Sequence, residues 1–573
     1  MSDKYELARL LAEIAQLLEL GGENIFKIRA YQNAARTIEK FDGNLTDPDA
    51  EARLTGLKGI GQALREIIHE YIATGRISYY EELKSSLPPG LFELMALPGL
   101  GAKKAWALHA QLGIQSLGEL EYACRENRLV TLAGFGSKTQ ERILQGIEDM
   151  KKFRGQFILG DAWPVADLLV EYIKLQPGVE RAAIVGSIRR GVEVVSSIEI
   201  LAACSAPAGL AAGIRGMQGS DHVISDEADK CVIRLVNGLI CTIYIVGADE
   251  YWPALVYHTG SSGYVAKLAD QARRQGLLFS AAGLQTASGE PVAVPDEQGL
   301  YSRLQVNYAE PECREDEDKL SPAGSEQAVL MSLSDIRGIF HVHTSYSDGS
   351  ASLADMAAAA RQRGWKYLGI ADHSRTAVYA RGLSIETVRA QRREIEAWNA
   401  KQAGFIILAG IESDILPDGS LDYPDEILAG FDFVVASVHS AFRQSEADMT
   451  RRIVKAVQNR YVTMLGHPTG RLLLGRKGYA VNLTEVIQAA AHSGTILEIN
   501  ASPHRLDLDW RWCRLAKEQG VLFAINPDAH AVSEFDYMRY GVAVARKAGL
   551  AAGDIINTQP FPAVLPLLQQ KRQ

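Results

Sequence analysis

The chain has 573 residues with a formal net charge of −9, so we expect several domains and no general electrostatic attraction for nucleic acid. Its six Cys show no CxxC spacing, which excludes a zinc finger or a disulfide framework of that kind. No apolar segment follows a basic start and no apolar run could span a bilayer, so we expect a cytoplasmic protein that contacts no membrane.

Helical patterns and paired glycines fill the first 150 residues. Apolar spacing predicts amphipathic helices over 5–20 and 26–40. Three Gly-apolar-Gly pieces then stand between helical patterns: Gly59-Ile60-Gly61, Gly99-Leu100-Gly101 and Gly134-Phe135-Gly136. Glycine lets the backbone approach a phosphate closely, and the next helix offers unpaired N–H groups at its N-terminus. The alternative is three ordinary helix turns.

These pieces resemble helix-hairpin-helix motifs, which grip the DNA backbone without reading its sequence. The region is also similar to the lyase-like (1–80) and fingers-like (81–152) domains of family X DNA polymerases. The family's Schiff-base lysine has no counterpart here, because the matching positions hold Ile67 and Ala63, so we expect no lyase activity. The resemblance implies DNA contacts by Gly59, Gly61, Gly99, Gly101, Lys103, Lys104, Gly134, Gly136 and Lys138.

The middle of the chain, 153–318, resembles the nucleotidyltransferase palm and thumb of the same polymerases. The similar segments are Val185–Glu193, Glu227–Lys230, Thr259–Ser261 and Glu310–Glu315. The family holds two Mg²⁺ ions with three Asp, and the matching residues here are Ser197, Glu199 and Thr242. A hydroxyl cannot replace a charged bridging ligand, so we predict an inactive polymerase site. Ser187 and Arg190, which touch the triphosphate in the family, are kept.

A linker over 319–334 leads to a C-terminal region, 335–573, in which seven short apolar runs alternate mostly with helical patterns. The helical patterns include Leu353–Arg363, Ile385–Ala400 and Glu446–Gln458. This alternation predicts a parallel sheet, and metal-ligand residues at most of the strand ends predict a barrel with its site on that face. His341 and His343 alternate on the first strand and Asp348 follows on a turn, a set that suits Zn or Mn.

The motifs at these strand ends, from His341-Val-His-Thr344 to Pro527-Asp-Ala-His530, resemble the PHP (polymerase and histidinol phosphatase) metal-dependent phosphoesterases. The resemblance implies a distorted seven-stranded α/β barrel with up to three divalent ions, of Mn²⁺, Zn²⁺ or Fe. The implied ligands are His341, His343, Asp348, His373, Glu412, His439, His467, Asp528 and His530. The predicted catalytic residues are His341, His343, Glu412, Asp528 and the phosphate-clamping Arg471 and Arg505.

The whole chain is thus similar to bacterial family X DNA polymerases with a C-terminal PHP domain, a multidomain α/β architecture. We predict a metal-dependent DNA-repair phosphoesterase, a 3′–5′ exonuclease that acts as a monomer on gapped, nicked or 3′-ended DNA. Abasic-site endonuclease and 3′-phosphatase activities stay open for the same site. The alternatives are an active family X polymerase in base excision repair with Mg²⁺ at Glu199, a small-molecule phosphatase of the histidinol-phosphate type, and a non-catalytic DNA-binding scaffold.

Overall fold

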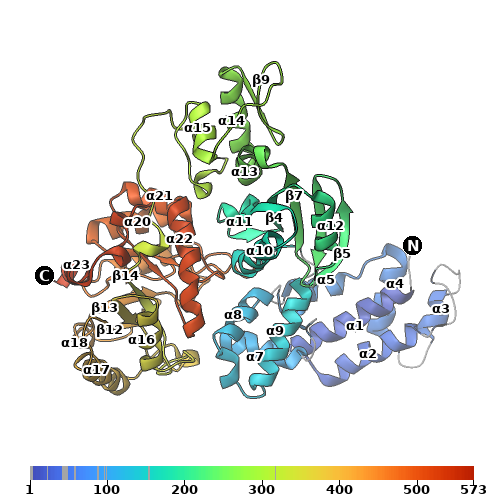
Figure 1. Cartoon of the computed structure of the whole chain (residues 1–573). Helices are drawn as coiled ribbons and strands as arrows, with labels where there is room; N and C mark the ends of the chain where they lie inside the picture. The colour runs from blue at the N-terminus through green and yellow to red at the C-terminus, as the bar shows by residue number, and fades with distance from the viewer. Residues whose placement is uncertain are drawn as a thin grey trace. The chain divides into compact units, whose positions relative to one another are not determined.

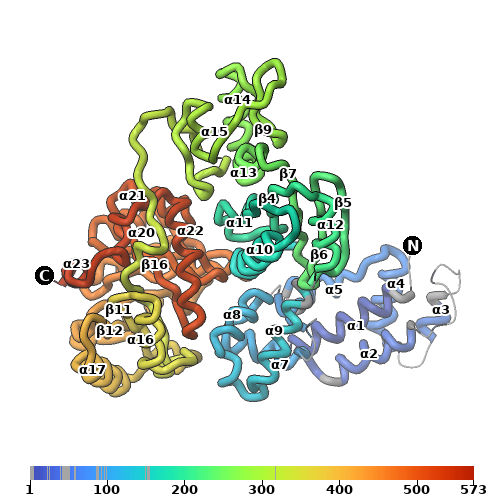
Figure 2. The backbone as a smooth tube through the Cα atoms, in the orientation of Figure 1, coloured from blue at the N-terminus to red at the C-terminus, as the bar shows by residue number. Residues whose placement is uncertain are grey.

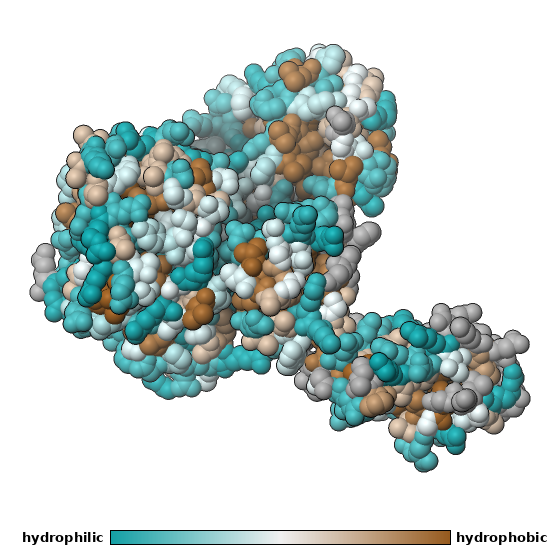
Figure 3. All heavy atoms as spheres, turned by 90° about the horizontal axis from the view of Figure 1, so that it is seen from below, coloured by the Kyte–Doolittle hydropathy of each residue, from teal (hydrophilic) through white to brown (hydrophobic). Residues whose placement is uncertain are grey.

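The structure is a computed structural model that describes residues 4–572 except 22, 40, 42–44, 46–49, 57–59, 87–89, 96, 98, 99, 152–154, 218 and 317. The chain forms two compact units, Met1–Arg125 with Leu129–Ile147 and Glu126–Arg128 with Glu148–Gln573. Within the described residues, no helix combines the length and apolar character needed to cross a membrane. The face drawn in Figure 3 is covered mainly by hydrophilic residues, between which hydrophobic residues stand in separate groups.

Amphipathic helices build the N-terminal unit, as the apolar spacing predicts. Leu7, Leu11 and Ile14 are fully buried on one face of the first helix, which packs along the second. The helices of this part are α1 (Lys4–Leu20), α2 (Ile25–Glu39), α3 (Ala50–Thr55), α4 (Gln62–Thr74), α5 (Ser78–Ser86), α6 (Leu91–Met95), α7 (Ala102–Leu112), α8 (Leu117–Arg125) and α9 (Ser137–Lys151).

A five-stranded sheet in the order β2-β4-β7-β6-β5 forms the centre of the middle region. Its strands are β2 (Val179–Val185), β4 (Ser197–Cys204), β5 (Ser220–Asp226), β6 (Lys230–Leu235) and β7 (Ile240–Val246). Helix α10 (Leu159–Lys174) packs on β2 and β4, and α12 (Pro207–Arg215) packs on β5. Strands β4 and β7 run parallel, and their register pairs Glu199 with Thr242. The sheet therefore brings together the positions that the sequence assigns to a polymerase site.

A smaller, mainly helical layer follows the sheet. It contains α13 (Tyr251–Thr259), α14 (Ser262–Arg274), the hairpin β8 (Leu277–Ser280) and β9 (Gly283–Thr286), and α15 (Glu297–Arg303). The buried Arg314 guanidinium pairs with Glu297 at 2.9 Å, and Glu297 also pairs with Arg189 at 2.6 Å. Burial raises the pKa of Glu297, but the two guanidinium groups outweigh it and lower the pKa below its ordinary value. This layer is thereby tied to the short helix α11 (Gly186–Arg189) beside the sheet.

Seven parallel strands in sequence order form the C-terminal barrel, which confirms the predicted architecture. A parallel bridge between Val342 and Ala529 returns the last strand to the first. The trace in Figure 2 follows this barrel from yellow to red. The strands are β10 (Gly338–Val342), β11 (Tyr367–Ile370), β12 (Ile406–Asp414), β13 (Phe433–Ser437), β14 (Met464–Leu465), β15 (Ile496–Asn500) and β16 (Phe523–Asn526).

Helices cover the outside of the barrel (Figure 1). Three of them lie within one residue of the predicted ranges at each end. The helices are α16 (Leu353–Gln362), α17 (Ile385–Asn399), α18 (Asp425–Leu428), α19 (Glu446–Val457), α20 (Leu483–Ser493), α21 (Trp510–Glu518), α22 (Met538–Lys547) and α23 (Phe561–Gln569).

Aromatic and aliphatic side chains fill the barrel interior. Phe340, Tyr367 and Phe433 are fully buried and contact one another, and α23 adds Val564 to the same cluster. A Cβ at Gly410 would lie 2.3 Å from the Phe433 ring, so a glycine is needed there. This packed interior leaves the strand C-termini as the place where polar side chains converge.

Candidate functional site

The nine predicted ligand residues all lie at or near the C-terminal ends of the barrel strands. Eight are buried, and the side chain of the ninth, His439, is only 6% exposed. Glu412 is a small exception to the predicted placement, because β12 continues for two residues beyond it. The loops after the strands thus carry most of the set, and one strand carries its central carboxylate.

Unusual backbone geometry places three of these residues. His341, His467 and Asp528 have φ angles of 56°, 25° and 53°, in the left-handed region that costs a non-glycine residue about 1–2 kcal/mol. The β10–β11 register also shifts between Ile339 and Val342. His341 and His343 do come together, with ring centroids 5.2 Å apart, but a distorted strand end brings them there rather than simple alternation.

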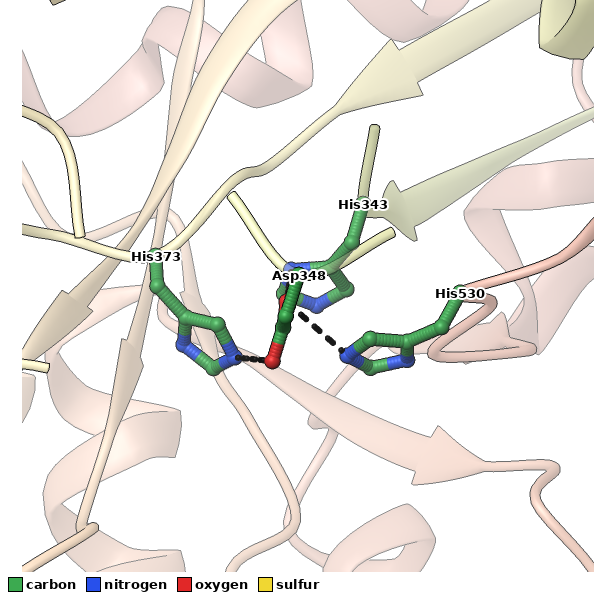
Figure 4. A group of neighbouring side chains, drawn as sticks. All are labelled: His343, Asp348, His373 and His530. Carbon is green, nitrogen blue, oxygen red and sulfur yellow. Dashed lines mark ion pairs between the residues drawn. The ribbon is translucent and has the colours of Figure 1, made fainter. Parts of the chain in front are cut away.

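One group of potential ligands combines His343, Asp348, His373 and His530 (Figure 4). The two oxygens of Asp348 lie 3.5 Å from His373 Nε2 and 3.3 Å from His530 Nε2. The rings of His343 and His530 stack at 4.2 Å. Residues from the loops after β10, β11 and β16 therefore meet at one point.

Two further groups share members with the first. His341, His343 and Asp528 form one, and His373, Glu412 and His439 form the other. Glu412 Oε1 lies 3.0 Å from His467 Nε2, which attaches the ninth residue to the set. Because His343 and His373 each belong to two groups, the nine residues form one continuous cluster.

Orphaned polar atoms test whether this cluster fits metal ions. Buried polar atoms that lack a hydrogen bond are rare in proteins, since each costs free energy. Imidazole and carboxylate donors together suit Zn, Mn or Fe. The donor set, with lone pairs that no hydrogen bond uses, fits such ions. The atoms without a hydrogen bond include His341 Nε2, His343 Nδ1, Asp348 Oδ2, both ring nitrogens of His373, Glu412 Oε2, His467 Nδ1 and His530 Nε2.

The electrostatics of the cluster favour the ligand form at His343 and Glu412, whereas at His341, His373, His439 and His530 the neighbouring carboxylates outweigh burial and raise the pKa above its ordinary value. Burial and the neighbouring His530 and His373 lower the pKa of His343 to about 3, so its imidazole stays neutral. Burial raises the pKa of Glu412, but His439, His341 and His373 outweigh it and hold that pKa well below its ordinary range. A neutral imidazole and an ionised carboxylate are the forms that bind cations.

Three buried carboxylates around the cluster were missed by the sequence analysis. Asp414 Oδ1 lies 2.6 Å from His439 Nδ1, and Glu498 Oε1 lies 2.6 Å from His341 Nδ1. Asp372 accepts hydrogen bonds from the backbone and hydroxyl of Thr344, both at 2.7 Å. Asp414 lies two residues after Glu412, and Glu498 lies two residues before Asn500. Strand alternation was the signal that could have found both.

The two predicted phosphate-clamping arginines differ in their surroundings. Arg505 is buried beside the cluster, with its Nε 3.7 Å from Asp528 Oδ2. Arg471 donates to Glu193 of the palm at 2.6 Å and to the carbonyl of Arg505 at 2.9 Å. Arg471 therefore joins the barrel to the palm in this structure, and its contact with a phosphate stays a prediction.

The palm places Glu199 beside hydroxyl residues, as the sequence predicts. Ser197 precedes it on β4 and Thr242 is its register partner on β7. Within the described part of the chain, no group of three His, Cys, Asp or Glu at metal-binding spacing includes Glu199. Burial raises the pKa of Glu199. The site is poor in carboxylates, and whether it polymerises stays a prediction.

Arg190, one of the two palm residues predicted to contact a triphosphate, is held by internal contacts. Arg190 pairs with Glu315 at 3.2 Å and donates to the Thr259 carbonyl at 2.8 Å. Ser187 lies in α11, the short helix that Arg190 directly follows. Lys547, from barrel helix α22, donates to the Arg190 carbonyl at 3.1 Å.

The glycine pieces of the N-terminal unit share a local geometry. Their apolar residues Ile60, Leu100 and Phe135 are buried, while Gly61 and Gly101 are N-cap residues and Gly136 directly precedes α9. A Cβ on any of these three glycines, or on Gly134, would meet nothing within 4 Å, so the helix N-termini are open. Gly59 and Gly99 lie outside the described residues.

The side chains near these hairpins agree with the sequence analysis. Lys103 and Lys138 are exposed, and the Lys104 ammonium lies 5.7 Å from the Phe135 ring centroid. Ile67 is buried in the helical core, at the position where a lyase would need an amine. The hairpins thus present backbone N–H groups and lysines, whereas their binding to DNA stays a prediction.

Family models match most parts of the chain. A helix-hairpin-helix domain matches 2–77 and a SAM-like helix-hairpin-helix tandem matches 91–149. A DNA polymerase beta thumb matches 254–315, and a PHP domain matches 340–502. The fold and the site therefore define a PHP-domain protein built on a polymerase-beta-like body.

Similar proteins agree with this class. The DNA polymerase/3′-5′ exonuclease PolX of Bacillus subtilis (strain 168) is 35% identical over 570 residues, which covers 99% of each chain. The chain belongs to this family, the bacterial family X DNA polymerases with a PHP domain. A probable phosphatase of Thermoanaerobacter sp. (strain X514) is 30% identical over 183 residues, 30% of this chain and 72% of its own. One of Shewanella sediminis (strain HAW-EB3) is 26% identical over 242 residues, 40% of this chain and 93% of its own.

The shared ligands predict the metal content of the protein. We expect two or three transition-metal ions per chain, because nine ligands are too many for one tetrahedral site. His343→Ala should remove more than one equivalent, since His343 belongs to two of the groups. Elemental analysis after loading with Mn²⁺ or Zn²⁺ measures both values.

The control is His222→Ala, which removes an exposed histidine on β5 of the palm and should leave the metal content unchanged. At most one equivalent in the unmodified protein would contradict a polynuclear site. Equal losses in the two variants would contradict the shared role of His343.

Proposed function

We propose that the chain is a metal-dependent DNA phosphodiesterase that shortens strands from their 3′ ends. The observation that carries this proposal is the continuous buried cluster of nine ligand residues, with its orphaned nitrogen and oxygen atoms. The glycine hairpins of the N-terminal unit, whose geometry suits contact with a phosphate backbone, support DNA as the substrate.

Nine side chains at the strand ends would hold the ions. His341, His343, Asp348, His373, Glu412, His439, His467, Asp528 and His530 would bind two or three ions. Bound ions of this kind lower the pKa of water, orient the phosphate and stabilise the departing oxygen. Glu412 has nitrogens of five imidazoles within 3.8 Å, so its carboxylate would serve neighbouring ligand groups. Arg505 supplies a buried guanidinium beside Asp528, in reach of a phosphate oxygen at the cluster.

The substrate follows from the parts of the chain outside the barrel. The probable phosphatases match only part of this chain, whereas the PolX relative covers its full length. A small-molecule phosphatase would have no use for the hairpins at Gly61, Gly101 and Gly136. We therefore propose DNA with gapped, nicked or free 3′ ends, contacted through its backbone by a monomer in the cytoplasm. Abasic-site cleavage and 3′-phosphate removal use the same chemistry and stay open.

Polymerisation is the second candidate function, because the full-length relative is named a polymerase as well as an exonuclease. Ser187 and Arg190 are present, but Glu199 is the one carboxylate of the three expected positions. Two hard cations need charged bridging ligands, so we propose that the polymerase centre is inactive or nearly so.

The hairpins generate a prediction about DNA binding. Lys103→Ala with Lys104→Ala should weaken binding to a similar extent for all sequences. It should also reduce the slope of log K against log salt by about 2, if each lysine contacts one phosphate. Fluorescence anisotropy over a salt titration measures both effects.

A charge-matched control is Lys319→Ala with Lys401→Ala, two exposed lysines outside the N-terminal unit. If both pairs change the slope equally, the hairpin contributes only net charge. An unchanged slope in the Lys103/Lys104 variant would show that this hairpin is an ordinary helix turn without a role in DNA binding.

The barrel and the palm can be separated by their products. With Mn²⁺ and a labelled primer-template, the unmodified protein should shorten the primer and should not extend it when dNTPs are added. His341→Ala with His343→Ala should reduce shortening by at least about 100-fold, because ligand loss empties the shared site. The variant should still bind DNA, since neither imidazole contributes to the apolar core.

Glu199→Ala is the matched control in the palm and should leave shortening unchanged. Restoring the carboxylates as Ser197→Asp, Glu199→Asp and Thr242→Asp should also leave it unchanged. Primer extension that survives the His341/His343 change and is lost in Glu199→Ala would show that the palm is catalytic.

A further inference from the structure

Glu498 is a fully buried carboxylate next to the metal cluster, yet it belongs to none of the ligand groups. It lies on β15, between the strand of His467 and the strand that leads to Asp528. Its two carboxyl oxygens accept hydrogen bonds from residues on both sides of β15. A buried carboxylate is costly unless its oxygens are fully hydrogen-bonded, so each of these contacts is informative.

The first contact fixes the tautomer of His341. Glu498 Oε1 lies 2.6 Å from His341 Nδ1 and accepts from the Asn526 amide at 2.9 Å. Glu498 Oε2 accepts from the His467 backbone N–H at 2.6 Å. Amide N–H groups can only donate, so both carboxyl oxygens act as acceptors, and this environment favours a proton on His341 Nδ1. In the neutral imidazole, which is the form that binds a cation, the lone pair then lies on Nε2.

That nitrogen is the one aimed at the cluster. His341 Nε2 lies 3.2 Å from Glu412 Oε1 and 3.3 Å from Asp528 Oδ1, and it makes no hydrogen bond. A proton on Nδ1 and a free lone pair on Nε2 are what a ligand imidazole requires. In the other tautomer, the proton on Nε2 would occupy the position of a cation.

A second chain of contacts reaches Asp528. The Asn500 amide donates to Glu498 Oε2 at 3.3 Å and to Asp528 Oδ2 at 3.0 Å. Its own oxygen accepts from the Ser502 backbone at 3.1 Å, which sets the direction of the amide group. Glu498 thereby contacts, directly or through one amide, ligand residues from three other strands.

We propose that Glu498 is a positioning residue for the ion held by His341, His343 and Asp528. It holds the His341 ring in its ligand tautomer, the backbone of His467 in its left-handed conformation, and Asp528 through Asn500. The inference rests on the proposed metal centre. It goes beyond that centre because it assigns an organising role to a residue that holds no ion.

Asp414 provides an internal comparison on the opposite side of the cluster. Its contact with His439 Nδ1 is equally short, at 2.6 Å, but His439 belongs to the group with His373 and Glu412. Loss of Glu498 and loss of Asp414 should therefore weaken different ions. A general loosening of the barrel would weaken all of them.

The test is a stepwise Zn²⁺ titration of the metal-free full-length protein by calorimetry, with absorption spectra of the Co²⁺-loaded forms. Glu498→Gln keeps the shape but places an amide N–H₂ where an acceptor is required. We expect one binding step to weaken by about 10- to 100-fold, with the other steps unchanged and an altered Co²⁺ spectrum. Asp414→Asn should weaken a different step, and the exposed Glu485→Gln should change none.

Thermal unfolding of the metal-free proteins shows whether Glu498→Gln folds. If it does not, Asn526→Ser removes one donor to the carboxylate and should weaken the same step by a smaller factor. Wild-type affinity at every step in the folded variants would overturn the role of Glu498. Primer shortening by the unmodified protein is measured separately. That assay tests the proposed nuclease activity, and the metal titration tests the role of Glu498.

Discussion

The burial of many imidazoles and carboxylates at one end of a nearly closed barrel is the constraint on which the candidate site depends. Groups of this kind are expensive to remove from water unless they are paired or bind a cation. Here the strand ends bring six histidines and three acids together, with several atoms left without a hydrogen bond. The packed interior around Phe433 and the left-handed residues at three strand ends hold this arrangement in place, and bound ions would offset its cost.

The sequence predicts the barrel and the side chains that gather at its strand ends because both follow from local patterns. A short apolar run followed by His or Asp identifies a strand end, and repeated alternation of strand and helix places those ends on one face. The supporting residues Glu498 and Asp414 stand at alternating positions on their strands, but their roles do not follow from that pattern alone, because they depend on contacts between strands that are distant in sequence. The distorted end of β10 was missed for a related reason, since neither His341 nor its neighbours is a glycine that would signal a positive φ.

In the palm, strand pairing determines which side chains meet. The parallel pair β4 and β7 brings Glu199 next to residue 242, which is a threonine, so a hydroxyl and not a second carboxylate stands there. The segment that carries both arginines is held by Arg190 with Glu315, and by Arg189 with Glu297. These partners neutralise the guanidinium groups, so ion pairs within the protein hold the shape of this segment.

Other ion pairs join the palm to the barrel. Lys547 of α22 contacts Glu315 and the Arg190 carbonyl, Arg546 pairs with Glu312 at 2.7 Å, and Arg471 pairs with Glu193. Paired and partly buried charges add little net stability, but they penalise any other docking arrangement that would leave a charge unpaired. The contacts therefore favour one orientation of the barrel on the palm. Arg471 also donates to the carbonyl of Arg505, the residue beside Asp528, so the docking contact and the metal cluster share a loop. A rigid palm would in this way fix the rim of the ligand cluster.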